Sequence, residues 1–347
     1  MLVYWLLFAY FAAGALFAQI SRGPETAPRP MLAIGAMIVA VLIGFRYQVG
    51  ADWLTYKFIF QRAARSDLLE VMRLGDPAYQ ALNWLVQQSG TEIWLVNAVC
   101  AVIFVWGLFR FCMVQPVPWA AVLLAVPYSV IVLAMGYTRQ GVAVGILMAG
   151  LASFVRSGSP MRFAAYVFAA ALFHRSAVVA FPLVALATNR NRAINLLLAI
   201  AVSIMLYDFF LGDALDDYIQ DYIRTRYSSQ GAVIRLAMNM VAVAVFWLLG
   251  RRLRFGEVEY RLWRNFCVGS ILLVGLLVVL PSSTAVDRMS LYVIPLQIAV
   301  LGRLPIAFPS RLPATTAIVV YCFAVQFVWL NFAQHSKYWV PYQLFPL

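Results

Sequence analysis

Eleven apolar segments follow one another along the chain, and they constrain the fold more than any other feature of the sequence. They lie at about 2–20, 31–45, 93–113, 117–136, 140–155, 163–187, 193–211, 233–250, 265–281, 289–302 and 314–333. A membrane helix needs about 20 mostly apolar residues, and helices satisfy their own backbone polar groups in lipid. The sequence therefore predicts an all-α polytopic membrane protein with about 11–12 transmembrane segments, some short or broken. Residues 1–347 are expected to form a single integral membrane domain.

The composition argues against a soluble fold. Hydrophobic residues make up 64% of the chain and charged residues 12%, whereas soluble domains have about 45–50% and about 25%. The net charge of +12 does not indicate a nucleic-acid partner, because the arginines are spread between apolar segments instead of forming a basic patch. The four cysteines lie in apolar segments without the spacing of metal ligands. We expect no metal and no cofactor.

The segment 163–187 decides the topology because His174 and Arg175 lie at its middle. If it crosses the membrane once, the basic loop 251–264 falls on the same side as residues 46–92. If it breaks into two short helices near His174, one side has 14 basic and three acidic residues, and the other has 12 basic and 11 acidic residues. The positive-inside rule favours the broken segment. We therefore expect both termini and residues 46–92 on the extracytoplasmic side.

Residues 46–92 are predicted to form extracytoplasmic amphipathic helices. Trp53, Tyr56 and Phe60 share one helical face by their spacing. Asp76 followed by proline is a typical helix N-terminus. Aromatic-rich helices of this kind lie in the headgroup layer, where they could cover a lipid-linked substrate.

Four arginines at or near helix ends map to this same side: Arg46, Arg139, Arg175 and Arg288. Each has a simpler interpretation when taken alone, as an interface anchor, a headgroup contact or, for Arg288 beside Asp287, a plain ion pair. Together they suit the binding of a pyrophosphate, because guanidinium groups recognise phosphate bidentately. Such a ring would also stabilise the negative charge of a leaving pyrophosphate.

Two further polar residues could perform proton transfer. Asp52 follows a short apolar segment, and His174 interrupts a longer one. An ionisable residue inside a membrane segment is a candidate functional residue by default. Either side chain could take the proton of an attacking sugar hydroxyl, and the sequence does not distinguish them.

Several short motifs occur in a recognisable order. They are Arg46-Tyr47-Gln48-Val49-Gly50-Ala51-Asp52-Trp53 with Tyr56, Arg139-Gln140, Phe173-His174-Arg175-Ser176-Ala177, Arg288 with Tyr292, and Trp339-Val340-Pro341-Tyr342. From residue 46 to the C-terminus this order resembles the EpsG family of bacterial exopolysaccharide proteins, which is related to Wzy-type polymerases. Many family members have Thr at the position of Ala51, and Lys or Asn at that of Arg175, so these two positions depart from the common pattern.

The resemblance implies a polysaccharide polymerase at the extracytoplasmic face of the bacterial inner membrane. Such a glycosyltransferase moves a glycan chain from its undecaprenyl pyrophosphate carrier to the next lipid-linked repeat unit. Its expected partners are the polyprenyl-pyrophosphate-linked oligosaccharide, membrane lipids, and chain-length regulator and export proteins. The expected catalytic residues are Asp52 and His174. The expected substrate-binding residues are Arg46, Tyr56, Arg139, Gln140, Arg175, Asp287, Arg288 and Tyr292.

Two other functions remain open at this point. One is a flippase or other transporter of lipid-linked oligosaccharides, and the other is a membrane-bound glycan acyltransferase that uses His174 as its base. A transporter is expected to contain internal repeats and polar residues on both leaflets. The sequence shows no repeat, and the basic residues of the opposite side have the pattern of orientation charges.

Overall fold

The computed structural model describes residues 1–20, 29–188, 231–280 and 283–345, with four further positions between 189 and 230. These residues form helices and no β-sheet, apart from one isolated antiparallel bridge between Arg46 and Leu344. The predicted all-α class is confirmed. The predicted apolar segment 193–211 lies outside the continuously described residues.

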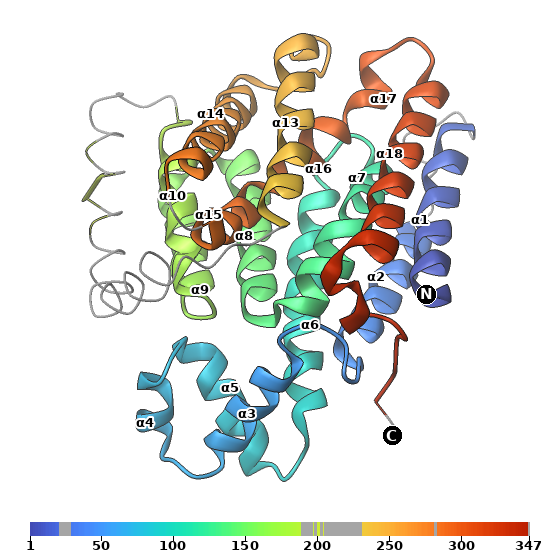
Figure 1. Ribbon diagram of the computed structural model, residues 1–347. Helices are drawn as coiled ribbons and strands as arrows, with labels where there is room; N and C mark the ends of the chain where they lie inside the picture. Colours follow the sequence, from blue (N-terminus) through green and yellow to red (C-terminus); the bar gives the residue numbers. More distant parts are fainter. Residues whose placement is uncertain are drawn as a thin grey trace.

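The described chain contains long helices with groups of shorter ones between them (Figure 1). The first half contains α1 (Leu2–Ile20), α2 (Arg29–Gly44), α3 (Trp53–Ala63), α4 (Leu68–Arg73), α5 (Pro77–Gln88), α6 (Ile93–Cys112), α7 (Pro118–Ala125), the π-helix η1 (Val126–Ala134) and α8 (Thr138–Ser157). The second half contains α9 (Pro160–Ala171), η2 (Arg175–Ala180), α10 (Phe181–Ala185), α13 (Gly231–Leu249), α14 (Glu257–Val279), α15 (Ser283–Ser290), η5 (Leu291–Val293), α16 (Pro295–Leu301), α17 (Leu304–Ala307), α18 (Arg311–Phe332) and η6 (Gln334–Tyr338).

Six of the described helices are long and apolar enough to cross a membrane, namely α1, α6, α8, α13, α14 and α18. A bent pair, 283–293 with 295–307, passes the same test together, with an angle of 42° between its halves. Four shorter apolar helices accompany them, at Pro30–Gly44, Pro118–Ala134, Pro160–Phe173 and Arg175–Ala185. The protein is therefore a multi-pass membrane protein in which several of the predicted segments are short or broken.

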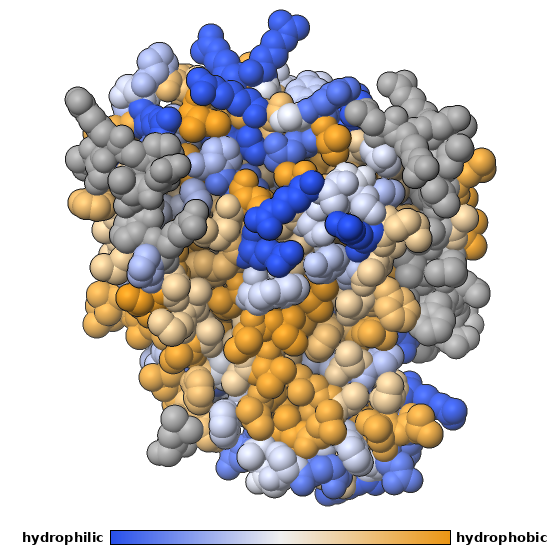
Figure 2. Space-filling view, turned by 180° about the vertical axis from the view of Figure 1, so that it is seen from behind, coloured by the Kyte–Doolittle hydropathy of each residue, from blue (hydrophilic) through white to orange (hydrophobic). Residues whose placement is uncertain are grey.

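The surface of the bundle is apolar where lipid would surround it. Leu248 and Val278 are 82% and 83% exposed, an arrangement that water would penalise. Figure 2 shows a broad hydrophobic area across one face of the molecule, with hydrophilic side chains above and below it. The arginines 251, 252 and 254 are exposed at the turn between α13 and α14, and Arg264 is exposed within α14. The turn lies at that upper end (Figure 1).

Helices α3 to α5 form a separate group at the opposite end, on the same side as both termini (Figure 1). The predicted aromatic face of α3 exists, because Trp53, Tyr56 and Phe60 are all buried. This face points into the protein, however, and not toward headgroups. The residues of α3 that face outward include Leu54 and Phe58, which are 77% and 63% exposed.

The predicted break at His174 is confirmed, because α9 ends at Ala171 and η2 begins at Arg175. Beyond the break the chain returns toward the end of the molecule where α14 begins. There the Asn265 amide donates to the Leu183 carbonyl at 3.0 Å, and Arg261 Nε donates to the Ala187 carbonyl at 3.2 Å.

A tight turn sets the direction of α9 before this break. Gly158 ends α8 in the left-handed region at φ 62°, a conformation that glycine adopts without steric cost. Ser159 then caps α9 by accepting a hydrogen bond from the Arg162 backbone N–H at 3.3 Å, and Pro160 occupies the first turn. Helix α9 therefore runs back along α8 and delivers His174 beside the first turn of α8.

Candidate functional site

A buried carboxylate, Asp76, lies at the centre of the polar cluster at this end of the bundle. Its Oδ2 atom accepts a hydrogen bond from Arg139 Nη1 at 2.7 Å and lies 3.5 Å from His174 Nδ1. Its Oδ1 atom accepts from the Arg175 backbone N–H at 3.1 Å. Arg175 also donates from its guanidinium to the Gly75 carbonyl at 3.0 Å. One acid therefore connects three segments of the chain.

The local sequence explains why these groups meet. Asp76 precedes Pro77 at the start of α5, as the sequence predicted, but its side chain does not cap that helix. The Ala78 backbone N–H instead donates to the Leu172 carbonyl at 2.9 Å, which joins the start of α5 to the end of α9. The Asp76 carboxylate therefore interacts with Arg139 of α8 and with the break between α9 and η2.

The ionisation of Asp76 reflects these neighbours. Burial alone would raise its pKa, but the adjacent His174 imidazole opposes the effect of burial, together with the charge of Arg139. The Arg175 backbone N–H adds a further contribution, and the net result is a pKa below the usual range. Asp76 is therefore ionised at neutral pH and neutralises part of the positive charge of the cluster.

Two tyrosine rings enclose Arg139. Its Cζ atom lies 6.0 Å from the ring centroids of both Tyr56 and Tyr79, and the two rings form an edge-to-face pair 5.8 Å apart. Such cation–π contacts restrict a guanidinium without consuming its hydrogen bonds. The Arg139 side chain keeps 28% of its surface exposed, so it is held in place and still accessible to a ligand.

Two residues from α15 and η5 complete this side of the cluster. The Gln140 side-chain amide donates to the Arg288 carbonyl at 2.8 Å, and the Ser176 and Tyr292 hydroxyls lie 3.0 Å apart. These contacts join the first turn of α8 and the start of η2 to the bent pair. Gln140, Arg175, Arg288 and Tyr292 are therefore brought together with Arg139 and His174.

Asp52 lies at the start of α3, partly exposed, and its side chain does not cap that helix. Burial raises the pKa of its carboxyl above the usual range. The positive charges of Arg288, Arg139 and His335 oppose that rise, which places Asp52 within electrostatic reach of the cluster. Burial, followed by the charge of Asp52, raises the pKa of Tyr56 to about 12.

Arg46 lies behind the cluster and not at its surface, with an exposure of 1%. Its guanidinium donates to the Ile43 carbonyl, to Asn97 Oδ1 at 3.3 Å and to Thr138 Oγ1 at 2.6 Å. Because Thr138 precedes Arg139, this arginine holds the first turn of α8. In this structure it is not accessible to a ligand.

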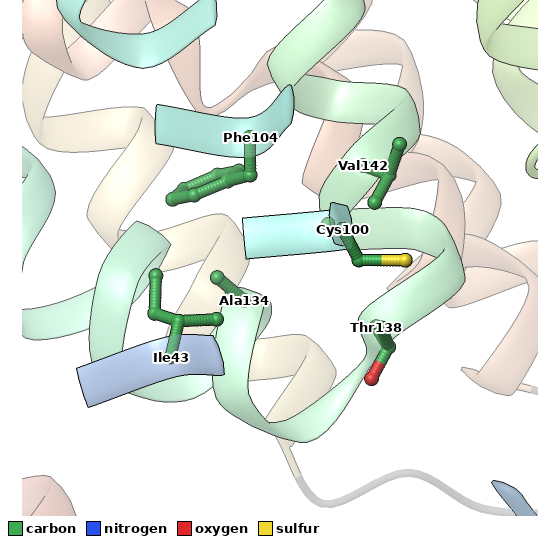
Figure 3. A pocket seen from close by; sticks show the side chains of 7 residues that line it. Ile43, Cys100, Phe104, Ala134, Thr138 and Val142 are labelled. Carbon is green, nitrogen blue, oxygen red and sulfur yellow. The ribbon is translucent and has the colours of Figure 1, made fainter. Parts of the chain in front are cut away.

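A narrow apolar crevice lies beside Thr138 (Figure 3), with no room for a water molecule. It is lined by Ile43, Cys100, Phe104, Ala134, Thr138, Gly141 and Val142. The crevice is therefore not itself a binding site for a sugar.

Asp287 has a different environment from its neighbour Arg288. It forms an ion pair with Arg235 of α13, and both side chains are buried. Arg235 also lies 5.1 Å from the ring of Tyr128 in η1. The contacts of Asp287 with α13 therefore fix the position of α15 in the bundle.

Sequence reasoning missed three contributors to the cluster. Asp76 was predicted only as a helix start, and Tyr79 and Asn97 received no role. A signal for Asp76 was present, since an acid within a region expected to meet four arginines is a candidate counter-ion. Among the described residues no group of three or more His, Cys, Asp or Glu side chains could hold a metal ion.

The model of the EpsG family matches residues 31–344, which is nearly the whole chain. No curated protein and no solved structure matches it.

Proposed function

The chain belongs to the EpsG family and is a multi-pass membrane protein of exopolysaccharide biosynthesis, and on this premise we propose that it is a polysaccharide polymerase. It transfers the growing glycan from a polyprenyl-pyrophosphate carrier to the next lipid-linked repeat unit. The reaction takes place on the extracytoplasmic face of the cytoplasmic membrane, where helices α3 to α5 lie.

The proposed reaction is a glycosyl transfer. A hydroxyl of the acceptor sugar attacks the anomeric carbon that is bonded to the carrier. The new C–O bond forms as the bond from the anomeric carbon to the pyrophosphate oxygen breaks, and the pyrophosphate leaves with the electron pair. A base takes the hydroxyl proton, and nearby guanidinium groups stabilise the negative charge of the leaving group.

The observation that supports this proposal is the convergence of Arg139 and Arg288 with two candidate bases. Arg139 is both restrained and 28% exposed, as expected for a guanidinium that binds a pyrophosphate. His174 and Asp52 lie near the same two arginines. The apolar outer residues of α3 to α5 provide a surface that the polyprenyl chain could contact.

Replacement of Arg139 tests the proposal. In a deletion strain, Arg139→Ala should reduce polymerisation about 100-fold or more, because one electrostatic donor to a leaving group contributes on this scale. Arg139→Lys should recover part of the activity, since lysine keeps the charge but loses the bidentate geometry. Arg156→Ala is the matched control, because Arg156 is exposed at the other end of the same helix.

The measurement is polymer length at equal membrane abundance. Polymer of normal length from a well-expressed Arg139→Ala protein would refute the role of this arginine. The intermediates of the deletion strain separate the rival functions. Single repeat units on the outer face indicate a polymerase, units retained inside indicate a flippase, and full-length polymer without acyl groups indicates an acyltransferase.

A further inference from the structure

The Asp76 side chain does not cap its own helix, α5, and bonds to other segments of the chain instead. It stands at the N-terminus of α5, where an aspartate normally accepts hydrogen bonds from the first turn. Its carboxylate makes no such bond. It accepts instead from Arg139 and from the Arg175 backbone N–H, which are 63 and 99 residues away in the sequence.

The His174 imidazole lies beside this carboxylate. Its Nδ1 atom lies 3.5 Å from Asp76 Oδ2, a long contact of the kind that shortens when a substrate binds. Both ring nitrogens are buried, and neither makes a hydrogen bond with the residues that the structure describes; the Asp76 carboxylate is within reach of Nδ1, which leaves Nε2 for a further partner. A buried ring nitrogen without a partner is costly unless a ligand completes it.

We propose that Asp76 is a positioning residue for two neighbours. Its Oδ2 atom holds the His174 ring so that Nε2 is available as the proton acceptor. The same Oδ2 atom holds Arg139 toward the pyrophosphate. This inference rests on the proposed function. It also selects His174 over Asp52 as the base, because only His174 has a carboxylate that orients it. A base oriented by a third group is the general arrangement of an activated proton acceptor.

The charges around His174 determine how it responds to pH. Burial has the largest effect and lowers the pKa of His174. Asp76 of α5 opposes this shift and favours the imidazolium, whereas Arg139 of α8 and Arg288 of α15 disfavour it. Arg175 follows His174 directly in the chain and is turned toward Gly75. Removal of the Asp76 charge leaves the arginines unopposed, so the imidazole becomes a weaker base.

The substitution Asp76→Asn tests this role. Asparagine keeps an oxygen that can accept from the Arg175 N–H but loses the negative charge. We expect the turnover rate of the purified full chain, with lipid-linked repeat units extracted from the deletion strain, to fall about 100-fold or more. The acid limb of the pH–rate profile should move to lower pH. Asp67→Asn is the matched control, because Asp67 holds the same position before α4 and is exposed.

A spectroscopic measurement tests the same inference without the reaction. The chain has two histidines, so a His335→Gln variant with ¹⁵N-labelled histidine reports His174 alone. Above about pH 8 the neutral ring should carry its proton on Nδ1 in the otherwise native chain, and this preference should be lost in the Asp76→Asn variant. A proton on Nε2 in the otherwise native chain would overturn the proposal.

The outcomes separate the two proposals. If the native chain does not polymerise repeat units, the proposed function fails. The ¹⁵N measurement of the neutral His174 ring still decides whether Asp76 orients that ring. If the native chain polymerises and Asp76→Asn matches it in rate and pH profile, the positioning role fails alone. In a His174→Ala background, Asp76→Asn should reduce the remaining rate only a few-fold. If it reduces that rate as much as it does when His174 is present, Asp76 acts through Arg139 and not through His174.

Discussion

At the scale of single residues, Gly50 shows how closely the segment before α3 packs. Its φ of +106° lies in a region that side chains rarely adopt. A Cβ atom built there would lie 2.5 Å from the Met135 carbonyl oxygen, in the turn that leads into α8. The Gly50 backbone N–H also donates to the Tyr338 carbonyl at 2.9 Å. Glycine therefore allows the segment that precedes Asp52 to contact the turn that precedes Arg139.

We expect Gly50→Ala to lower the thermal unfolding temperature more than Gly90→Ala does. Both glycines have positive φ, but a Cβ atom at Gly90 meets nothing within 4 Å. Gly90→Ala should therefore cost about 1 kcal/mol for backbone strain alone, and Gly50→Ala should add the cost of the clash. Unfolding in detergent measures both variants. Equal shifts would show that the packing around Gly50 adjusts without cost.

Part of the cluster could be predicted from sequence, and part could not. The arginines and His174 stand out because a charge in or beside an apolar segment is rare. The burial of Arg46 was not predictable, since its partners Asn97 and Thr138 are ordinary polar residues on other helices. Asp76 was predicted only as a helix start. Its hydrogen-bond partners are distant in the sequence, and only the fold brings them together.

At the scale of elements, the helix break at His174 was predictable and the π-helix η1 was not. The break follows from the charge asymmetry of the connecting loops. The π-helix occupies residues whose sequence predicts an ordinary apolar helix. Its Ile131 carbonyl accepts a hydrogen bond at 2.7 Å from the indole of Trp339, which lies 208 residues away. A tertiary contact of this kind leaves no periodic signal in the sequence.

The ion pair between Arg235 and Asp287 should contribute to the packing of α13 against α15. Removal of one partner leaves a buried charge uncompensated, which costs about 3–5 kcal/mol. We therefore expect Arg235→Leu and Asp287→Leu each to lower the unfolding temperature strongly. The double variant should be more stable than either single one, because it leaves no unpaired charge.

The control for this cycle is the ion pair between Arg261 and Glu257, whose carboxylate is 75% exposed. Exposed pairs contribute little, so Glu257→Ala should leave the unfolding temperature nearly unchanged. If the double variant is as unstable as the sum of the single ones, the two residues act independently. The position of Arg288, beside Asp287, would then depend on other contacts.

At the scale of the whole molecule, the two ends of the bundle present different charged residues. One end has the exposed arginines of the turn between α13 and α14. The other end has α3 to α5 and both termini (Figure 1). The polar cluster around Asp76 lies there too, because Asp76 begins α5. Clustered basic residues mark the cytoplasmic side of membrane proteins, so this asymmetry predicts an extracytoplasmic cluster.

Cysteine labelling tests this orientation. The four native cysteines are buried, so they should give little background. Arg65→Cys and Arg252→Cys place thiols at exposed positions on opposite ends of the molecule. In spheroplasts, we expect a membrane-impermeant maleimide to label Cys at position 65, and to label Cys at position 252 only after lysis. The reverse pattern would place Asp76, Arg139 and His174 in the cytoplasm and would exclude the proposed polymerisation at the outer face.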